Sequence, residues 1–541
     1  MGADPPTPPP PRPPLQGVRG LLRQSGTTSV AAAAGVASGL VLDAAILAAV
    51  GASAVGDAFF AAATIMLAIV SIVTVAANQA LVPAISTWLV EKGEPESWRL
   101  TSATLHLTAA LGVLLVAVTI PLAEPLMALT LPGVDEATVG EAAAAVRVLM
   151  PVIPLVALTE ILRALLNARH RFAAPAAMHV VMNGVAAALV VAATSPDAVT
   201  ISWAYVAGAA AQLLFIVAMA LRAGWRWRPV WAVRDPAIRA VGALVVRPLA
   251  GASLNPLARV GELLFVSFLP AGSITIMRTG YRLVSAIGGT VLFRSVMVVL
   301  LPRLTRATAR RDDVETRQLT RLGFRILLVI SVGLTAVMAV LATPATLALF
   351  GRGKFSAEDA ALLGVTLAVY ALSLPGSGIQ RALLAPFFAR LDTRVPFRNT
   401  VYGVVANLAL VPVCIAPFGN SADAVIGVAV AYSLAQYVNV AHAWARLRGI
   451  DLQPRGVRSM LLPLLVAAAA SIVVMVGGVY LLELGEETRR GVLLLETGLL
   501  AVAGVAVFAG VALLLGLDDV RRLRGDGSPP VPAEDPPPSE G

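Results

Sequence analysis

The sequence predicts an all-α polytopic membrane protein with about fourteen transmembrane helices, arranged as two parallel six-helix lobes plus two C-terminal helices. Composition is the first of three observations behind this prediction. Of the 541 residues, 57% are hydrophobic and only 13% are charged, and the mean hydropathy is +0.81. Because soluble globular domains carry about 25% charged residues, this composition excludes a soluble protein.

The second observation is a series of fourteen apolar segments, each close to the roughly 20 residues that a helix needs to cross a bilayer. Six of them predict the first lobe, at residues 28–50, 58–84, 102–131, 145–166, 174–194 and 198–221. Six more predict the second lobe, at residues 243–269, 280–301, 323–350, 358–384, 397–417 and 423–445. The last two cover residues 458–482 and 489–516.

The third observation is an internal repeat with an offset of about 220 residues. Leu81-Val82-Pro83 closes one apolar segment, as Leu300-Leu301-Pro302 does in the second half. Ala168-Arg169 is followed by a proline at the same spacing as Ala389-Arg390. Each repeat holds an even number of apolar segments, so both copies enter the membrane in the same direction. A parallel two-lobe repeat suits a transporter with a substrate cavity between its halves.

Basic residues gather on one side of the predicted membrane. They precede the first segment and follow the even-numbered ones, as in Arg169 and Arg171 and in the run from Arg303 to Arg321. The positive-inside rule therefore predicts that both termini are cytoplasmic. The net charge of +9 follows from this loop bias, so nucleic acid is not an expected partner.

The predicted organisation has six parts. They are a disordered Pro-rich cytoplasmic tail (1–27), an N-lobe (28–222), a basic amphipathic cytoplasmic linker (223–242), a C-lobe (243–446), the last two helices (458–516) and a second disordered Pro-rich cytoplasmic tail (517–541). The tails are predicted to be disordered because such compositions cannot bury an apolar core.

Ionisable residues inside the apolar segments are the candidate functional residues, because a charge in the hydrocarbon core is costly and normally faces a cavity. They are Asp43, the pairs Glu160 with Arg163 and Arg259 with Glu262, and the cations Arg278, Arg282 and Arg294.

Sequence spacing separates these candidates. Residues three apart share a helix face, so Glu160 can pair with Arg163, and Arg259 with Glu262. Such pairs are either packing bridges or cavity groups. Arg282 lies one turn deeper than Arg278 and has no acid near it in sequence. It is therefore predicted to be an unpaired cation that faces a cavity.

No catalytic constellation is present in the sequence. The four histidines are scattered without metal-ligand spacing, and the single cysteine, Cys414, lies in an apolar segment. The run from Gly351 to Lys354 lacks the spacing of a nucleotide-binding P-loop. We therefore expect a transporter rather than an enzyme, with no cofactor, no metal site and no ATPase of its own.

Several short motifs, in order along the chain, resemble the MurJ/MviN family of lipid II flippases. They are Asp57-Ala58-Phe59-Phe60, Gln79 to Pro83, Leu166-Asn167-Ala168-Arg169, Ser267-Phe268-Leu269, Arg282-Leu283 and Leu349 to Gly353. The resemblance covers roughly residues 28–516. It implies the fourteen-helix fold of the multidrug/oligosaccharidyl-lipid/polysaccharide exporter superfamily, in which two lobes form a V-shaped cavity and the last two helices form a lipid-tail groove.

The implied function is translocation of a polyprenyl-pyrophosphate-linked saccharide, with lipid II as the leading candidate, across the cytoplasmic membrane of a bacterium by alternating access. The resemblance implies that Arg282 binds the pyrophosphate. The other cations, Arg278, Arg259 and Arg294, are expected to support it. Asp57 is expected to act in gating at the outer mouth, or else to cap the second helix, and Asp43 and Glu262 are further gating or coupling candidates.

The first predicted helix departs from the family pattern. Val36 and Leu42 stand where the family usually has cavity arginines, whereas Asp43 is kept. This loss of charge leaves alternatives open: a flippase for another lipid-linked glycan or metabolite, a cation-coupled drug exporter, or a non-transporting cell-wall scaffold. Membrane lipids and, through the Pro-rich tails, cell-wall synthesis proteins are the other expected partners.

Overall fold

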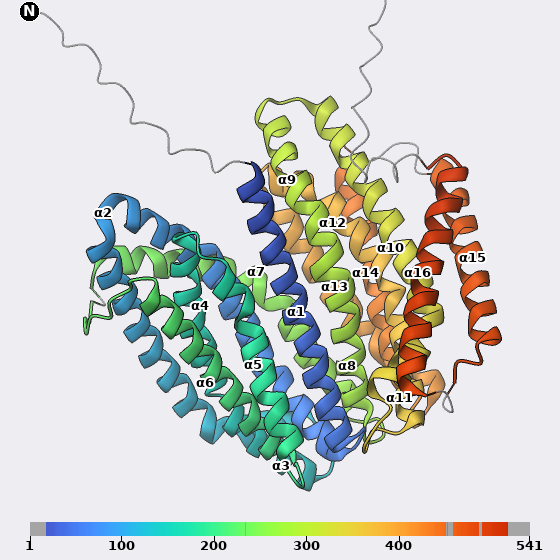
Figure 1. Ribbon diagram of the computed structural model, residues 1–541, viewed down its shortest axis with the longest axis horizontal. Helices are drawn as coiled ribbons and strands as arrows, with labels where there is room; N and C mark the ends of the chain where they lie inside the picture. Colours follow the sequence, from blue (N-terminus) through green and yellow to red (C-terminus); the bar gives the residue numbers. More distant parts are fainter. Residues whose placement is uncertain (1–17, 233, 451, 453–457, 486–488, 518–541) are drawn as a thin grey trace, which may run out of the picture.

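A computed structural model describes residues 18–232, 234–450, 452, 458–485 and 489–517. Every regular element in these ranges is helical, and ten of the helices there are long and apolar enough to cross a membrane. One of the ten, with 77 residues, contains two of the predicted segments. The prediction of an all-α polytopic membrane protein is confirmed (Figure 1).

The first lobe contains six helices. They are α1 (Val18–Val50), α2 (Ala54–Thr130), α3 (Glu136–Leu149), α4 (Val152–Ala168), α5 (Ala173–Ala192) and α6 (Ala198–Arg222). The second and third predicted segments both lie in α2. The helix is interrupted at Gly93, whose backbone has φ 77° and ψ 173°, a conformation that favours glycine. The fourth predicted segment is divided between α3 and α4.

The second lobe contains most of the remaining helices. They are α7 (Pro236–Val266), α8 (Ser273–Val284), η1 (Ser285–Leu292), α9 (Phe293–Ala309), α10 (Asp313–Phe350), α11 (Ala357–Ala371), α12 (Ser373–Ala389), α13 (Arg394–Ile415), η2 (Ala416–Phe418) and α14 (Ala424–Arg448). The eighth predicted segment runs through α8, the π-helix η1 and α9. The chain then forms α15 (Arg458–Leu481) and α16 (Arg490–Leu514).

Two predicted boundaries were wrong. Helix α1 begins at Val18, inside the predicted tail 1–27, whose first 17 residues lie outside the described ranges. Helix α7 begins at Pro236, inside the predicted linker 223–242. Asp235 caps this helix by accepting a hydrogen bond from the Ala237 amide at 2.9 Å. An aspartate followed by proline at the first helical position is a strong start signal, which explains the early start of α7.

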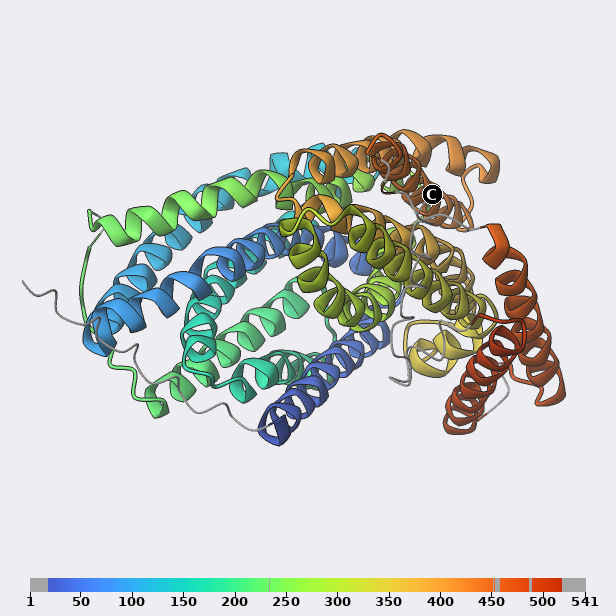
Figure 2. The same cartoon turned by 90° about the horizontal axis from the view of Figure 1, so that it is seen from above.

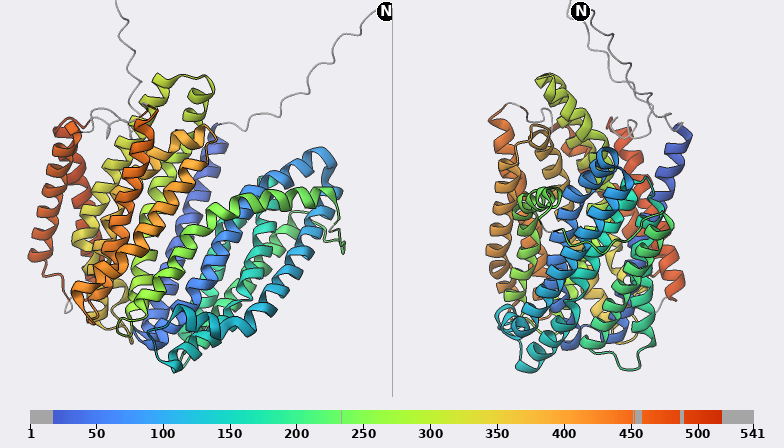
Figure 3. Two further views of the ribbon diagram at one scale, coloured as in Figure 1. Left: turned by 180° about the vertical axis from the view of Figure 1, so that it is seen from behind. Right: turned by 90° about the vertical axis from the view of Figure 1, so that its left-hand side faces the viewer.

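The helices form two groups, and the distance between the two groups changes along the molecule. The ribbons of the two groups lie close together at the end where α3, α8 and α11 meet, and they splay apart toward α2 and α9 (Figures 1 and 3). We call the first end the closed end, defined by residues 48–57, 131–134, 267–275 and 351–355. The start of α1 and the end of α16 both lie at the splayed end.

Helix α7 connects the two groups physically as well as in sequence. It packs against α2 of the first lobe and against α13 of the second. Seen from above, its green ribbon runs along α2 before it reaches the second lobe (Figure 2). Helices α15 and α16 pair with each other and pack against α10, where Gly333 leaves the space that the ring of Phe508 occupies.

Candidate functional site

The closed end contains a carboxylate that joins the two lobes. Asp57, in the first turn of α2, accepts hydrogen bonds from the amides of Gly272 at 2.7 Å and Thr275 at 2.8 Å. It also accepts one from the Thr275 hydroxyl at 2.7 Å. Gly272 is the N-cap of α8 and has no side chain to offer, so Asp57 of the other lobe supplies the missing cap.

This arrangement corrects one of the two roles predicted for Asp57. Capping of its own helix was wrong, because the Ser53 side chain accepts the hydrogen bond from Gly56 and caps α2. Asp57 is buried, with 4% of its surface exposed. A negative charge at a helix N-terminus is also favoured by the helix dipole, so the cap stabilises contact between the lobes.

Glycines let the two backbones approach closely at the closed end. The amide of Lys354, between α10 and α11, donates to the carbonyl of Ala48 in α1 at 2.8 Å. A Cβ atom on Gly353 would overlap that carbonyl, and one on Gly51 would lie 2.5 Å from the carbonyl oxygen of Lys354. Both glycines have positive φ, at 64° and 70°. Residues with side chains would therefore be both strained and sterically blocked at these positions.

Two further contacts extend the closed end. A Cβ atom on Gly272 would lie 2.8 Å from the backbone of Ala52. The amide of Gly133, in the loop after α2, donates to the Ser267 hydroxyl at 3.2 Å. These contacts come from four separate segments, so the closed end is a broad layer of contacts between the lobes.

Deeper in the molecule, a second charged contact crosses between the lobes. Arg282 of α8 forms an ion pair with Asp43 of α1, with 2.6 Å between Nη1 and Oδ1. The prediction that Arg282 is unpaired was therefore wrong. Its partner lies far away in sequence, where helical spacing gives no information. Gly39, one turn before Asp43, leaves room for the guanidinium, since an added Cβ would lie 3.1 Å from Nη2.

The exposure of the two partners differs. The Asp43 side chain is 3% exposed, whereas that of Arg282 is 31% exposed. Tyr205 of α6 interacts with Arg282, and Arg278 lies within electrostatic range of both Arg282 and Asp43. Arg282 is thus held by the first lobe yet remains accessible. Leu42, at one of the positions where the family pattern has an arginine, is fully buried in the apolar core.

The predicted pair of α7 is confirmed and is part of a larger cluster. Arg259 and Glu262 are 2.7 Å apart, and Asn407 of α13 donates a hydrogen bond to the carboxylate of Glu262. The guanidinium of Arg259 lies over the rings of Tyr281 and Tyr432, at 4.5 and 4.8 Å from their centres. Cation–π contacts of this kind stabilise a desolvated arginine.

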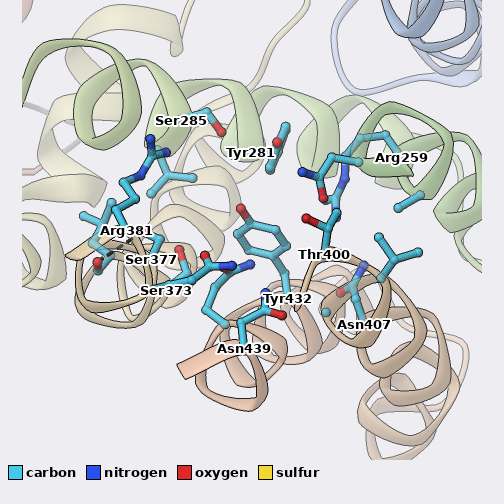
Figure 4. A pocket seen from close by; sticks show the side chains of 18 residues that line it. Arg259, Tyr281, Ser285, Ser373, Ser377, Arg381, Thr400, Asn407, Tyr432 and Asn439 are labelled. Carbon is cyan, nitrogen blue, oxygen red and sulfur yellow. Dashed lines mark hydrogen bonds between the residues drawn. The ribbon is translucent and has the colours of Figure 1, made fainter. Parts of the chain in front are cut away.

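Arg259 and Glu262 pair with each other rather than with Arg282 and Asp43, and Arg278 lies within electrostatic range of both pairs. Arg259 lines a cavity of about 390 Å³ inside the second lobe, between α7, α8, α12, α13 and α14 (Figure 4). The structure divides the predicted site residues into three groups: Asp57 at the closed end, Arg282 with Asp43 and Arg278 between the lobes, and Arg259 with Glu262 in this cavity. The side chain of Arg294, in α9, lies outside the described residues.

The pair Glu160 and Arg163 of α4 is confirmed as well, and Arg163 also donates to Asn78 of α2. These bonds join neighbouring helices within the first lobe, which is the packing role considered for this pair.

Sequence reasoning missed Thr275 and Gly353, which act through partners in the other lobe. The only signals were the glycines beside predicted helix ends, which are common for other reasons. Asn407, an amide inside an apolar helix, has the role expected of such residues, because it forms a hydrogen bond to Glu262 of a neighbouring helix.

Comparison with known protein families gives the decisive observation for identity. The family model described as "Lipid II flippase MurJ" matches residues 46–492. The chain belongs to this family. The proteins that give this family its description are lipid II flippases, which are transporters.

Curated relatives agree with the family assignment over part of their length. The chain is 27% identical over 247 residues to a probable lipid II flippase MurJ of Vibrio cholerae, covering 46% of this chain and 45% of the relative. It is 27% identical over 343 residues to that of Rhizobium meliloti, covering 60% and 62%. It is 27% identical over 264 residues to the lipid II flippase MurJ of Burkholderia cenocepacia, covering 47% and 51%. The alignments thus span about half the length of these relatives.

Solved structures agree on the fold. A lipid II flippase MurJ in an inward closed conformation matches with a TM-score of 0.70 at 18% identity, covering 93% of this chain and all of that one. An inward-facing multidrug resistance MATE family transporter of the MOP superfamily matches with a TM-score of 0.62 at 15% identity, covering 77% of this chain and 95% of that one.

Proposed function

We propose that this chain translocates lipid II, a polyprenyl-pyrophosphate-linked saccharide, from the inner to the outer leaflet of the bacterial cytoplasmic membrane. The ion pair between Arg282 and Asp43 is the observation that carries the proposal, together with membership of the family. It holds an accessible arginine between the two lobes, where a phosphate group could meet it. A planar guanidinium suits phosphate oxygens, which it can bind with two parallel hydrogen bonds.

The ion pair also suggests how substrate binding is coupled to movement, because Arg282 must leave Asp43 in order to bind a pyrophosphate. In the resting state, Asp43 neutralises Arg282 at 2.6 Å. An incoming pyrophosphate carries more negative charge than one carboxylate and competes with Asp43 for the same guanidinium. Binding of substrate therefore loosens a contact between α1 and α8, and this couples substrate binding to movement of the lobes.

Asp57 then has the role of a latch. We propose that the closed end faces outward and the splayed end faces the cytoplasm, so that substrate enters between the lobes from the cytoplasmic leaflet. The positive-inside distribution of arginines supports this orientation, in which both termini are cytoplasmic. Release to the outer leaflet requires that Asp57 leave Gly272 and Thr275, which opens the closed end while the splayed end closes.

The last part of the proposal concerns α15 and α16 and the polyprenyl tail of the substrate. Most of their side chains other than those facing α10 are apolar and exposed, including Leu462, Leu465, Leu495 and Leu499. The polyprenyl tail is proposed to remain in lipid along this pair while the headgroup crosses. Neither a drug exporter nor a scaffold is favoured by the lobe-bridging arginine.

Complementation tests the function directly. Cells depleted of their own lipid II flippase should regain growth when this chain is expressed, and lipid II should stop accumulating in the inner leaflet. The purified chain should also bind undecaprenyl pyrophosphate more tightly than the uncharged alcohol undecaprenol. Failure of both experiments with a well-expressed protein would show that the proposed function is wrong.

A further inference from the structure

The cavity inside the second lobe lies beside the contact between Arg282 and Asp43, and its lining is mostly polar. Hydroxyl and amide side chains from five helices point toward its centre, among them Ser285, Thr400, Asn407 and Asn439 (Figure 4). Its volume of about 390 Å³ is in the range of about 300–1,000 Å³ that is typical of small-molecule sites.

Two buried acceptors in this cavity have no partner. The Oδ1 atoms of Asn407 and Asn439 accept no hydrogen bond within the described part of the chain, although these residues are only 2% and 6% exposed. The Asn407 orientation is fixed, because its amide nitrogen donates to Glu262. A buried polar atom without a partner is unfavourable, so both oxygens favour a ligand that donates hydrogen bonds.

The cavity also offers donors and further acceptors. The Nη1 atom of Arg259 is buried without a hydrogen-bond partner among the described residues. The hydroxyls of Ser377 and Thr400 donate to backbone carbonyls, which leaves their oxygen lone pairs free to accept. The site thus needs a ligand that can donate and accept at several points.

The charged residues that line the cavity limit the class of ligand that it can bind. Glu262 neutralises Arg259 in the lining, so this pair offers no net charge that would attract an ion. No group of three or more His, Cys, Asp or Glu side chains that could hold a metal ion occurs among the described residues. A fully ionised oxyanion such as sulfate has no hydrogens to donate to the oxygens of Asn407 and Asn439. An uncharged polyhydroxylated ligand meets every requirement.

Asn439 is held in position by a neighbouring glycine. Its side chain lies where a Cβ atom on Gly403 would be, against α13, and the residue lines the cavity. Helix α8 ends at the same place, and the π-helix η1 begins at Ser285. Single π-helical turns often occur at functional sites because they redirect side chains.

The cavity lies next to the pyrophosphate position. Ser285 follows Arg282 by three residues on the same helical path, which is about 4.5 Å along the axis and about 60° around it. Tyr281, adjacent to Arg282, also lines the cavity. A group attached to a phosphate on Arg282 is therefore within reach of the cavity.

We infer that this cavity is a subsite for the uncharged saccharide of the lipid-linked substrate, with the unpartnered oxygens of Asn407 and Asn439 accepting hydrogen bonds from sugar hydroxyls. This inference rests on the proposed function, since it assigns a second part of the same substrate. The two lobes then have different roles in binding. The pyrophosphate is bound between the lobes, and the saccharide is recognised by the second lobe alone.

Binding measurements with two lipids test the inference. The probes are undecaprenyl pyrophosphate and undecaprenyl pyrophosphate that carries a neutral disaccharide, and affinity is measured by native mass spectrometry on the purified full chain. The saccharide-bearing lipid should bind about tenfold more tightly. Asn439→Ala and Ser285→Ala should each reduce this preference about fivefold, the effect of one lost hydrogen bond. The affinity for undecaprenyl pyrophosphate alone should not change.

Asn420→Ala is the matched control, because Asn420 is exposed in the loop before α14, away from the cavity. The inference is overturned if the two lipids bind equally, or if Asn439→Ala weakens both to the same extent. It is also overturned if the chain binds Na⁺ alone and Asn439→Ala abolishes that binding. Absence of any binding of undecaprenyl pyrophosphate to the unmodified chain would instead refute the proposed function.

Discussion

Asp57 and Thr275 are 218 residues apart in sequence and are joined by two hydrogen bonds, of 2.8 Å from the amide and 2.7 Å from the hydroxyl. This is a side chain of one lobe capping a helix of the other. Because the acceptor is charged, each bond is stronger than an ordinary one, at about 1.5–3 kcal/mol. The stability of the closed end therefore depends strongly on one carboxylate.

The first prediction concerns this latch. Asp57→Ala should open the closed end, Asp57→Asn should open it less because one acceptor oxygen remains, and Thr275→Val should open it least. The reporter is the labelling rate of Val50→Cys by a membrane-impermeant maleimide in a Cys414→Ala background, since Val50 is buried at the closed end. Equal labelling in all three variants and the parent would rule out the latch.

The second prediction concerns the ion pair. Arg282→Ala leaves Asp43 buried without its partner, so it should destabilise the folded protein by about 3 kcal/mol and reduce expression. The double variant Arg282→Ala with Asp43→Ala should recover expression but not transport. Arg282→Lys should retain expression and partial transport, because the charge remains without the planar fork. Full transport by the double variant, measured by complementation, would exclude Arg282 from substrate binding.

The third prediction uses two glycines with similar positive φ. Gly353 has φ 64° and Gly419 has φ 59°, but an added Cβ would meet the Ala48 carbonyl only at Gly353, whereas nothing lies within 4 Å at Gly419. Gly353→Ala should therefore raise labelling of Val50→Cys at least tenfold and reduce transport. Gly419→Ala should leave both unchanged. Similar behaviour of the two variants would attribute the effect to backbone strain rather than to the contact between lobes.

The fourth prediction concerns orientation. With Cys414→Ala as background, a cysteine at Asp423 should be labelled from outside intact cells and one at Arg310 only after the membrane is permeabilised. Asp423 precedes α14 at the closed end, and Arg310 follows α9 at the splayed end. The reverse pattern would invert the proposed topology and with it the direction of transport.

The sequence was sufficient for the helices and for contacts within a single helix. Apolar length predicted the spans, and the three-residue spacing predicted the pairs of Arg259 with Glu262 and of Arg163 with Glu160, because such geometry is fixed by the helix itself. The same reasoning could not predict the partner of Arg282. Its partner Asp43 belongs to another lobe, and a contact of that kind depends on how the lobes pack, which no local pattern encodes.

Capping signals were more informative than apolar length at one boundary. Apolar length predicted that the seventh helix starts at residue 243, whereas Asp235 followed by Pro236 marks its true start. The start of α7 lies against α2, where Ile238 is buried in an apolar cluster that includes Leu100 and Ala103. Packing against α2, rather than the length needed to cross the bilayer, therefore explains why this part of α7 is helical.

The path of α7 has a mechanical consequence. Its 31 residues correspond to about 46 Å of continuous rod, of which one part is fastened to α2 and another to α13. When the lobes tilt, this rod must bend, and Pro248 and Pro256 each remove one of its internal hydrogen bonds. A tilt of one lobe against the other would therefore bend α7 between its two attachments, and the positions of Pro248 and Pro256 are where the helix would resist such bending least.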